Sequence, residues 1–550
     1  MKNFIDKIVA IFQNIIESLE NKKIGLISWC ITVLIFSLMR GFLENISVGF
    51  DYINQKQSLF LFFHFPAFYF IAFSLFILLS YVLTKEKIKK ISKASLGLLP
   101  FILLAPIFDF LIFQGKFTMT KYAEPIWQKT LGIGDMIIFF FKYSLFGPLG
   151  FLNFGGSISF FDNQQNLFSL NYISNYGLKI ELILIIMFFS FYILLKTKNI
   201  WKAFLAVFLS QVLLFLIGYF PFIITNFLKL PNSTLSFHRV SKLNPIFEWD
   251  YIVISIFLVF VTIISLAWFF IYDKRKFLAF IKNMRLPRLG MYLGAFWYGV
   301  YLADIPFSLN FFDYLILIIA NLAIILSWMF AVGSNDIVDE RVDKISNSNR
   351  PLASGIMNKE EIKSINIILR VASYLTAFLT GYAFFVTIII RSCISYLYSN
   401  EPFRLKKYPI ISTFCLALSV LLGTIGGYLI LSSNTIYDFP VKLVVLILVV
   451  FTLSMNVIHI KDYEGDKEDG VRTIPVIFGL EDGKLIVGIM SALSFLIPPL
   501  MYQDKFNILI IPSIVFSFLA FFLINRKDFK EWPVLLLYYI YTLPVMFYLY

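Results

Sequence analysis

Residues 313–334 read DYLILIIANLAIILSWMFAVGS, and the chain continues at 335–343 as NDIVDERVD. After Asp313 the first stretch carries no charge, and its length is about that which an α-helix needs to cross the hydrocarbon core of a bilayer. The second stretch is rich in carboxylates. Together they predict a membrane helix that ends in an acidic cluster at one surface of the membrane.

The composition of the whole chain agrees with this reading. Of 550 residues, 59% are hydrophobic and 15% are charged, and the mean hydropathy is +0.80. A soluble domain averages about 45–50% apolar and about 25% charged residues, so a soluble, disordered or disulfide-scaffold protein is excluded. The formal net charge of +13 would suit nucleic acid. We expect no nucleic-acid partner, however, because the chain has almost no long polar surface to carry such a face.

The first half of the chain contains six apolar stretches with the length of membrane spans. Lysines concentrate in loop 85–94 and again at 196–202, which marks both turns as cytoplasmic by the positive-inside rule. We therefore expect a cytoplasmic N-terminus, with residues 1–23 forming an amphipathic helix on the membrane surface. The six predicted spans are 24–43, 58–84, 95–113, 178–195, 202–226 and 250–272.

A seventh apolar stretch, 131–152, is interrupted by Asp135, Lys142 and Pro148. An even number of crossings must lie between the two cytoplasmic turns, and spans 95–113 and 178–195 already supply two. We therefore interpret 131–152 as a re-entrant or interfacial segment on the outer side.

The basic stretch 274–288 contains six Lys and Arg residues. We interpret it as a cytoplasmic linker between an N-terminal membrane domain, 1–273, and a C-terminal domain, 289–550. Gly381 divides a helical stretch that is too long for one span. The C-terminal domain then has nine predicted spans: 289–306, 313–334, 363–380, 382–398, 409–431, 440–460, 484–501, 506–524 and 533–549. The chain is thus predicted to be an all-α polytopic membrane protein with about 15 transmembrane helices.

Basic residues recur in alternate loops of the C-terminal domain, at 335–362, 399–408, 461–483 and 525–532. The positive-inside rule places these loops in the cytoplasm. Two of them carry carboxylate clusters at helical spacing. On a helix, the first cluster would occupy an arc of about 100° and the second an arc of about 60°. The clusters consist of Asn335, Asp336, Asp339 and Asp343, and of Asp462, Asp466 and Asp469.

Two acidic faces at the same membrane surface would repel each other without a cation. Hard oxygen ligands at this spacing suit Mg²⁺, which binds through one or two carboxylates together with phosphate oxygens. Lys and Arg side chains alternate with the carboxylates in both loops. Carboxylates with cations beside them fit a Mg²⁺–diphosphate complex, because the metal and the basic residues share the neutralisation of the anion.

These motifs resemble those of a known family. From about residue 285 to 549 the sequence is similar to the UbiA superfamily of intramembrane prenyltransferases. The first family motif, NDxxDxxxD followed by Arg-Pro and a turn of a small residue and Gly, is matched from Asn335 through Arg350 to Gly355. The second, DxxxD followed by Gly and Thr-x-Pro, is matched from Asp462 to Pro475. A third signature, a Tyr before a basic loop, is matched by YSNEPFRLKK at 398–407.

The resemblance implies nine helices around a central cavity, with a diphosphate held at its cytoplasmic mouth by two Mg²⁺ ions. It implies that Asn335, Asp339 and Asp343 serve one metal with Asp336 nearby, and that Asp462 and Asp466 serve the other. Asp339, Asp343, Asp462 and Asp466 would be the catalytic carboxylates. The implied diphosphate-binding residues are Arg350, Tyr398, Arg404, Lys406, Lys461 and Arg472.

Three further residues are candidates from their positions. Arg370 and Arg391 lie inside predicted spans, roughly 10 Å below the cytoplasmic surface, where charged groups usually face a cavity or a partner. One or both would bind diphosphate or an anionic acceptor; the alternative is that they extend to the lipid headgroups. His459, beside the second motif, would donate a hydrogen bond to phosphate or simply lie at the membrane interface.

The resulting hypothesis is Mg²⁺-dependent transfer of a polyprenyl group from its diphosphate to a membrane-associated acceptor. The sequence leaves two classes of acceptor, an aromatic quinone precursor and a glycerol-phosphate lipid. The alternative is a transporter or lipid-binding scaffold, which predicts acidic residues near mid-membrane and repeat symmetry between the halves. The N-terminal domain carries no motif that indicates its function.

Overall fold

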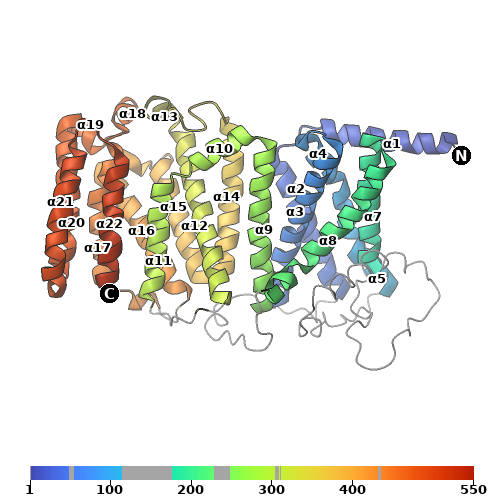
Figure 1. Ribbon diagram of the computed structural model, residues 1–550, viewed down its shortest axis with the longest axis horizontal. Coiled ribbons are helices and arrows are strands. Elements are labelled where there is room, and N and C mark those ends of the chain that lie inside the picture. The colour runs from blue at the N-terminus through green and yellow to red at the C-terminus, as the bar shows by residue number, and fades with distance from the viewer. Residues whose placement is uncertain are drawn as a thin grey trace, which may run out of the picture. The chain divides into compact units, whose positions relative to one another are not determined.

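The computed structural model describes residues 2–48, 55–113, 176–227, 248–303, 309, 311–431 and 435–549. Within these ranges the chain forms helices and no strands (Figure 1). It divides into two compact units, the first ending at Tyr272 and the second running from Asp273 to the C-terminus. The predicted re-entrant segment 131–152 lies outside the described residues.

The first unit contains six stretches that are long and apolar enough to cross a membrane, at the places where the sequence predicts six spans. The amphipathic helix predicted for residues 1–23 is present as α1. The helices are α1 Lys2–Asn21, α2 Leu26–Val48, α3 Gln55–Thr84, α4 Ile88–Ser95, η2 Leu96–Leu103, α5 Leu104–Phe113, α7 Tyr176–Thr197, α8 Ile200–Phe227 and α9 Glu248–Tyr272. Segments α4, η2 and α5 follow one another without a gap and together replace the predicted span 95–113.

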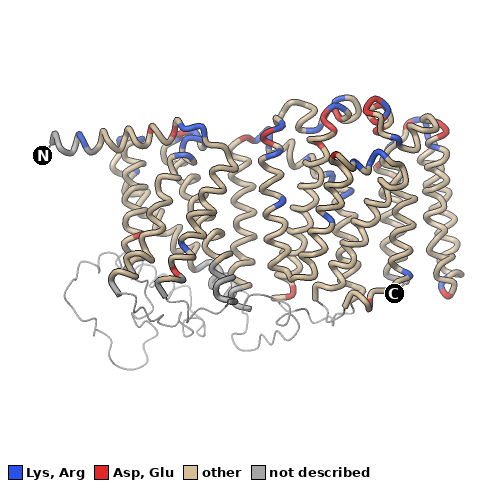
Figure 2. The backbone as a smooth tube through the Cα atoms, turned by 180° about the vertical axis from the view of Figure 1, so that it is seen from behind, with Lys and Arg blue, Asp and Glu red and all other residues tan. Residues whose placement is uncertain are grey.

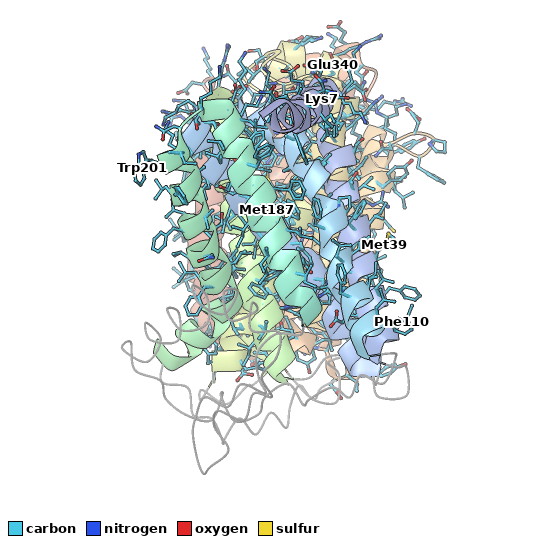
Figure 3. All side chains as sticks on the ribbon, turned by 90° about the vertical axis from the view of Figure 1, so that its right-hand side faces the viewer. Lys7, Met39, Phe110, Met187, Trp201 and Glu340 are labelled. Carbon is cyan, nitrogen blue, oxygen red and sulfur yellow. The ribbon has the colours of Figure 1, made fainter. Side chains whose placement is uncertain are left out.

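The outer surface of the first unit is apolar. Figure 3 shows Met39, Phe110, Met187 and Trp201 projecting from its helices, and Trp201 is 78% exposed. Such side chains face lipid in a membrane protein, because lipid tails solvate them as well as a protein core does. The first unit is therefore built to lie in a bilayer.

A buried charged network lies inside this unit, and the sequence analysis did not predict it. Arg40 on α2 pairs with Glu44 one turn later, and its Nε lies 3.6 Å from Glu181 Oε2 on α7. Tyr69 on α3 donates a hydrogen bond of 2.9 Å to the other oxygen of Glu181. The network thus ties three membrane helices together through charged contacts away from water.

In the second unit, α10 (Lys274–Lys282) precedes the bundle. Seven stretches here are long and apolar enough to cross a membrane. Helix α11, with 17 residues, and helix α22 also belong to the bundle, since α11 packs against α16 and α22. The total of about 15 spans stays a prediction. The long helices are α11 Leu286–Leu302, α12 Phe311–Val338, α14 Lys359–Thr380, α15 Tyr382–Ser399, α16 Pro409–Ile430, α17 Val441–Ser454, α20 Leu480–Met501, α21 Phe506–Ile524 and α22 Glu531–Leu549.

Two glycines let the backbones of α11 and α16 approach closely. A Cβ at Gly299 would clash with the carbonyl oxygen of Thr424, and one at Gly427 with that of Phe296. Gly381 separates α14 from α15 as predicted, and its φ of +143° is a conformation that L side chains rarely adopt. The first two glycines therefore fix how closely α11 packs against α16, and Gly381 fixes where α14 ends and α15 begins.

The acidic clusters do not lie on continuous helices as expected. Helix α12 ends at Val338, Asp339 caps the short helix α13 (Glu340–Ser346), and α17 gives way to the 3₁₀ helix η9 (Met455–His459) before α18 (Tyr463–Glu468). Helices α13 and α18 pack against each other. Figure 2 shows charged residues concentrated at this end of the second unit.

We predict that Arg40→Met destabilises the first unit by about 3–5 kcal/mol, because it removes the cation that two buried carboxylates contact. The measurement is thermal unfolding of the detergent-solubilised chain, and exposed Lys89→Met is the matched control. Equal melting temperatures for Arg40→Met and the control would contradict the prediction.

Candidate functional site

The two acidic motifs meet through one asparagine. Asn347, which caps the C-terminus of α13, donates hydrogen bonds from Nδ2 to Asp462 Oδ1 at 2.9 Å and to Asp343 Oδ1 at 3.3 Å. The amide of Gly465 on α18 donates to Ser346 Oγ at 3.1 Å. Asn347 and Asp462 are 115 residues apart along the chain, yet the two motifs form one polar layer.

This polar layer forms one end of a cavity of about 200 Å³. The rest of the cavity wall is mostly apolar and includes Trp328, Val332, Leu416, Phe451 and Leu535. The arrangement offers a charged mouth for an anion and an apolar interior for a hydrocarbon chain. The predicted carboxylate and amide residues that line it are Asn335, Asp339, Asp343, Asp462 and Asp466.

Basic residues neutralise the carboxylates of the first motif. Arg350 pairs with Asp343 and lies 3.4 Å from Asp336, and Lys406 pairs with Asp339. Arg404 pairs with Asp469 and lies 3.5 Å from Asp339. The third signature thus contacts residues of both the first and the second motif.

Asp336 is placed differently from its neighbours in the motif. It is 1% exposed, accepts hydrogen bonds from Arg285 at 2.5 Å and from Asn283 at 2.6 Å, and does not line the cavity. Its contacts orient two arginines, Arg285 and Arg350, both of which do line it.

The remaining predicted residues divide into those at the cavity and those away from it. Tyr398, Arg391 and His459 line the cavity, and His459 lies between Ser412 Oγ at 3.3 Å and Asp466 Oδ2 at 3.8 Å. Three others do not line it. Lys461 pairs with Glu531 at 2.8 Å, the backbone of Arg472 binds Lys407, and Arg370 is exposed against the rings of Phe330 and Tyr374.

Arg285, Arg288 and Asn347 are site residues that the sequence pattern does not single out. The two arginines belong to the predicted basic linker, yet Arg288 lines the cavity and binds Glu531 at 2.6 Å. Their place directly before an apolar span was the available signal. Asn347 had none, because it lies in a polar loop of ordinary composition.

Burial and neighbouring charges shift the pKa values of these carboxylates. Burial raises the pKa of Asp343 to about 6, and Arg350 offsets only part of this effect. Burial likewise raises the pKa of Asp466. Burial also acts on Asp462, but its effect is outweighed by the charges of Lys461 and Arg350 and by the hydrogen bond from Asn347. The pKa of the Asp462 carboxyl therefore lies below its usual value.

The donor set of the polar layer fits a hard divalent cation, although the side chains point to their basic partners. Among the described residues, no three His, Cys, Asp or Glu side chains are grouped closely enough to hold an ion as they stand. Asp343 Oδ2, however, is buried and has no hydrogen-bond partner within the described part of the chain. An oxygen of this kind is stabilised by a cation, since an unsatisfied buried acceptor is costly.

Comparison with known proteins identifies the bundle. A family model described as the UbiA prenyltransferase family matches residues 291–540, within the second unit. A digeranylgeranylglyceryl phosphate synthase from Sulfurisphaera tokodaii is 31% identical over 204 residues, which is 36% of this chain and 70% of the relative. This chain belongs to the UbiA prenyltransferase family. As a member of the UbiA family it is an enzyme that transfers prenyl groups.

Other relatives of this UbiA protein are named as synthases of a glyceryl phosphate or as a phytyltransferase. A digeranylgeranylglyceryl phosphate synthase from Methanococcus aeolicus is 30% identical and covers 40% of this chain and 74% of its own. A homogentisate phytyltransferase from Synechocystis is 27% identical, and the match covers 30% of this chain and 55% of the relative. A UbiA homologue from Archaeoglobus fulgidus bound to GPP and Mg²⁺ covers 49% of this chain and 98% of its own, at 20% identity and a TM-score of 0.41.

We predict that Asn347→Leu slows prenyl transfer about 10- to 100-fold, because it removes the 2.9 Å hydrogen bond to Asp462 and one hydrogen bond to a charged acceptor contributes about 1.5–3 kcal/mol. The measurement is the steady-state rate of transfer. The control is Ser348→Ala, an exposed position one residue later, for which the rate should not change. Unchanged transfer in Asn347→Leu would mean that the contact between the motifs does not matter for the reaction.

Proposed function

We propose that this enzyme transfers a polyprenyl group from its diphosphate to a membrane-associated acceptor, using Mg²⁺ held by the two acidic motifs. The observation that carries the proposal is the layer in which Asn347 joins Asp343 to Asp462 at the mouth of an apolar cavity. Diphosphate fits the charged mouth, and a prenyl chain fits the apolar interior.

The metal ligands in this proposal come from both motifs. Asn335, Asp339 and Asp343 would hold one ion, and Asp462 and Asp466 the other. When bound, Mg²⁺ would neutralise part of the diphosphate charge and so stabilise the leaving group. We place Asp336 beside the first ion as the residue that orients Arg285 and Arg350, in keeping with its contacts.

The ion pairs of the polar layer suggest how the chain accommodates a metal and a diphosphate together. Arg350 and Lys406 each face a carboxylate of the first motif. If the carboxylates turn to the metal, these cations become available to phosphate oxygens, and the local charge stays balanced. We assign diphosphate binding to Arg350, Lys406 and Tyr398, which line the cavity, and to Arg404, which lies beside Asp339. Lys461, Arg472 and His459 remain further candidates at the loops around it.

The chemistry proposed here is an ionisation followed by bond formation. The allylic C–O bond breaks and the diphosphate leaves with the electron pair, while the acceptor nucleophile supplies the pair for the new bond. The acceptor then loses the proton of its reacting O–H or C–H group, and the released diphosphate takes this proton up. Cations around the mouth stabilise the charge that develops on the leaving group. The apolar wall excludes water that would otherwise capture the prenyl cation.

The protein is an integral membrane protein by its many apolar helices. We propose that the acidic loops and the N-terminus face the cytoplasm, in keeping with the basic residues among these loops (Figure 2). The relatives' names include a glyceryl phosphate product and an aromatic acid acceptor, which supports an amphiphilic acceptor in either class.

The experiment that tests this proposal uses the purified full chain with radiolabelled geranylgeranyl diphosphate, Mg²⁺ and acceptors of both classes. Asp339→Ala and Asp466→Ala should each slow diphosphate release and transfer by about 100-fold or more, because each removes stabilisation of the leaving group. Exposed Glu360→Gln is the control and should not change either rate. A wild-type chain with no Mg²⁺-dependent release or transfer would reject the proposal.

Metal binding should weaken as the pH falls through about 6. The pKa of Asp343 is raised to about 6, so its carboxylate is protonated below that pH and competes poorly for a cation. One protonation of this kind weakens apparent affinity about tenfold at pH 5 relative to pH 7. The measurement is Mn²⁺ titration without prenyl diphosphate, because phosphate also titrates near pH 6. Asp343→Asn should bind weakly at both pH values, and a wild-type affinity independent of pH would contradict the assignment.

A further inference from the structure

Arg391 is a buried cation in the interior of the cavity. It lies on α15, is 4% exposed and lines the cavity wall. Its guanidinium carbon is 4.4 Å from the ring centre of Tyr292 on α11, a cation–π contact. Tyr292 in turn packs against Trp328 on α12, with ring centres 5.0 Å apart.

The other basic residues of the cavity wall all face a carboxylate. Arg285 pairs with Asp336, Arg288 with Glu531, Arg350 with Asp343 and Lys406 with Asp339. Within the described ranges, the side chain of Arg391 has no carboxylate within 4.0 Å, and its contact is with the ring of Tyr292. A charge removed from water costs several kcal/mol unless a counter-ion compensates it, so this position suits an anion supplied from outside the chain.

Three helices place Arg391 deeper than the polar layer. It lies eight residues before Ser399, which binds Asn335 at 3.2 Å, and eight residues span about 12 Å of helix. Trp328 lies seven residues before Asn335, about 10 Å along α12, and Tyr292 lies one turn beyond Arg288 on α11. Arg391 therefore belongs to a second layer, below the residues assigned to diphosphate.

We propose that Arg391 binds the anionic head of the acceptor, a phosphate or a carboxylate, and thereby selects anionic acceptors over neutral ones. This inference rests on the proposed function. An anion held one layer below the diphosphate would position the acceptor nucleophile between them, near the allylic carbon, where reacting atoms must come within about 3–3.5 Å. Arg391 gives up no proton in this step, because it acts only as a counter-ion.

The same geometry gives a reason for selection against neutral acceptors. Positive charge develops on the prenyl group as diphosphate leaves, and an uncompensated guanidinium nearby would oppose it. An anionic acceptor neutralises Arg391 before ionisation, whereas a neutral one leaves two cations close together. Discrimination then comes from an unfavourable contact in the wrong complex as well as a favourable one in the right complex.

The test compares Arg391→Met and Arg391→Lys with wild type in the full chain, using geranylgeranyl diphosphate as donor. One pair of acceptors is geranylgeranylglyceryl phosphate and geranylgeranylglycerol, and the other is homogentisate and methylhydroquinone. Each pair differs in the anionic group, so the arms separate a phosphate from a carboxylate. Arg370→Met is the matched control, since this exposed arginine on α14 lies away from the cavity wall.

We expect wild type to prefer the anionic member of one pair. Arg391→Met should raise KM for that acceptor and lower kcat/KM about 10- to 100-fold, the size of a lost charge-assisted interaction. The KM for the donor should stay unchanged, which also shows that the variant is folded. The slow release of diphosphate without acceptor should not fall, because the variant removes an uncompensated cation that opposes ionisation. Arg391→Lys keeps the charge and should retain the preference with a severalfold higher KM, and it carries the test if Arg391→Met does not fold.

Three results would overturn the inference: equal use of anionic and neutral acceptors by wild type, unchanged acceptor KM in both variants, or a raised donor KM with an unchanged acceptor KM. The last would assign Arg391 to the diphosphate. Failure of the proposed function has a different signature, because a wild-type chain that releases no diphosphate under any condition rejects the donor chemistry itself.

Discussion

The structure of the second unit depends on neutralising the negative charge of carboxylates that are buried at the end of an apolar bundle. Asp339 and Asp343 are at most 7% exposed, and an isolated ionised carboxylate in such a place would take up a proton or unfold its surroundings. Lys406 and Arg350 supply the opposite charges from other loops. The loops are therefore fixed by charge, while the helices are fixed by apolar packing.

This division explains how the site combines rigidity with exchangeable partners. Close contacts at Gly299 and Gly427 hold α11 against α16, and this packing sets the position of Arg288 and Tyr292. The ion pairs in the loops at the end of the bundle need only keep the total charge balanced. In the proposed function, a metal and a diphosphate would replace internal ion pairs without moving the helices, because each new ligand would bring the charge that its partner loses.

The helices and motifs could be predicted from sequence because a bilayer requires long apolar runs, and because the motifs are contiguous. The stretch at 313–334 became α12, and Gly381 separates α14 from α15. The helix break at Asp339 was not predicted, since periodicity alone extends a helix until a breaking residue appears. Pairs such as Arg285 with Asp336, 51 residues apart, depend on tertiary packing that no local pattern encodes.

The central claim is that the two acidic motifs form one diphosphate site. A double-mutant cycle on Asp339→Asn and Asp466→Asn, read out as the rate of diphosphate release, tests it most directly. Residues that act as a unit are strongly non-additive, so the double variant should be about as slow as the slower single variant. Losses that simply multiply in the double variant would mean that the motifs act independently and would contradict the account.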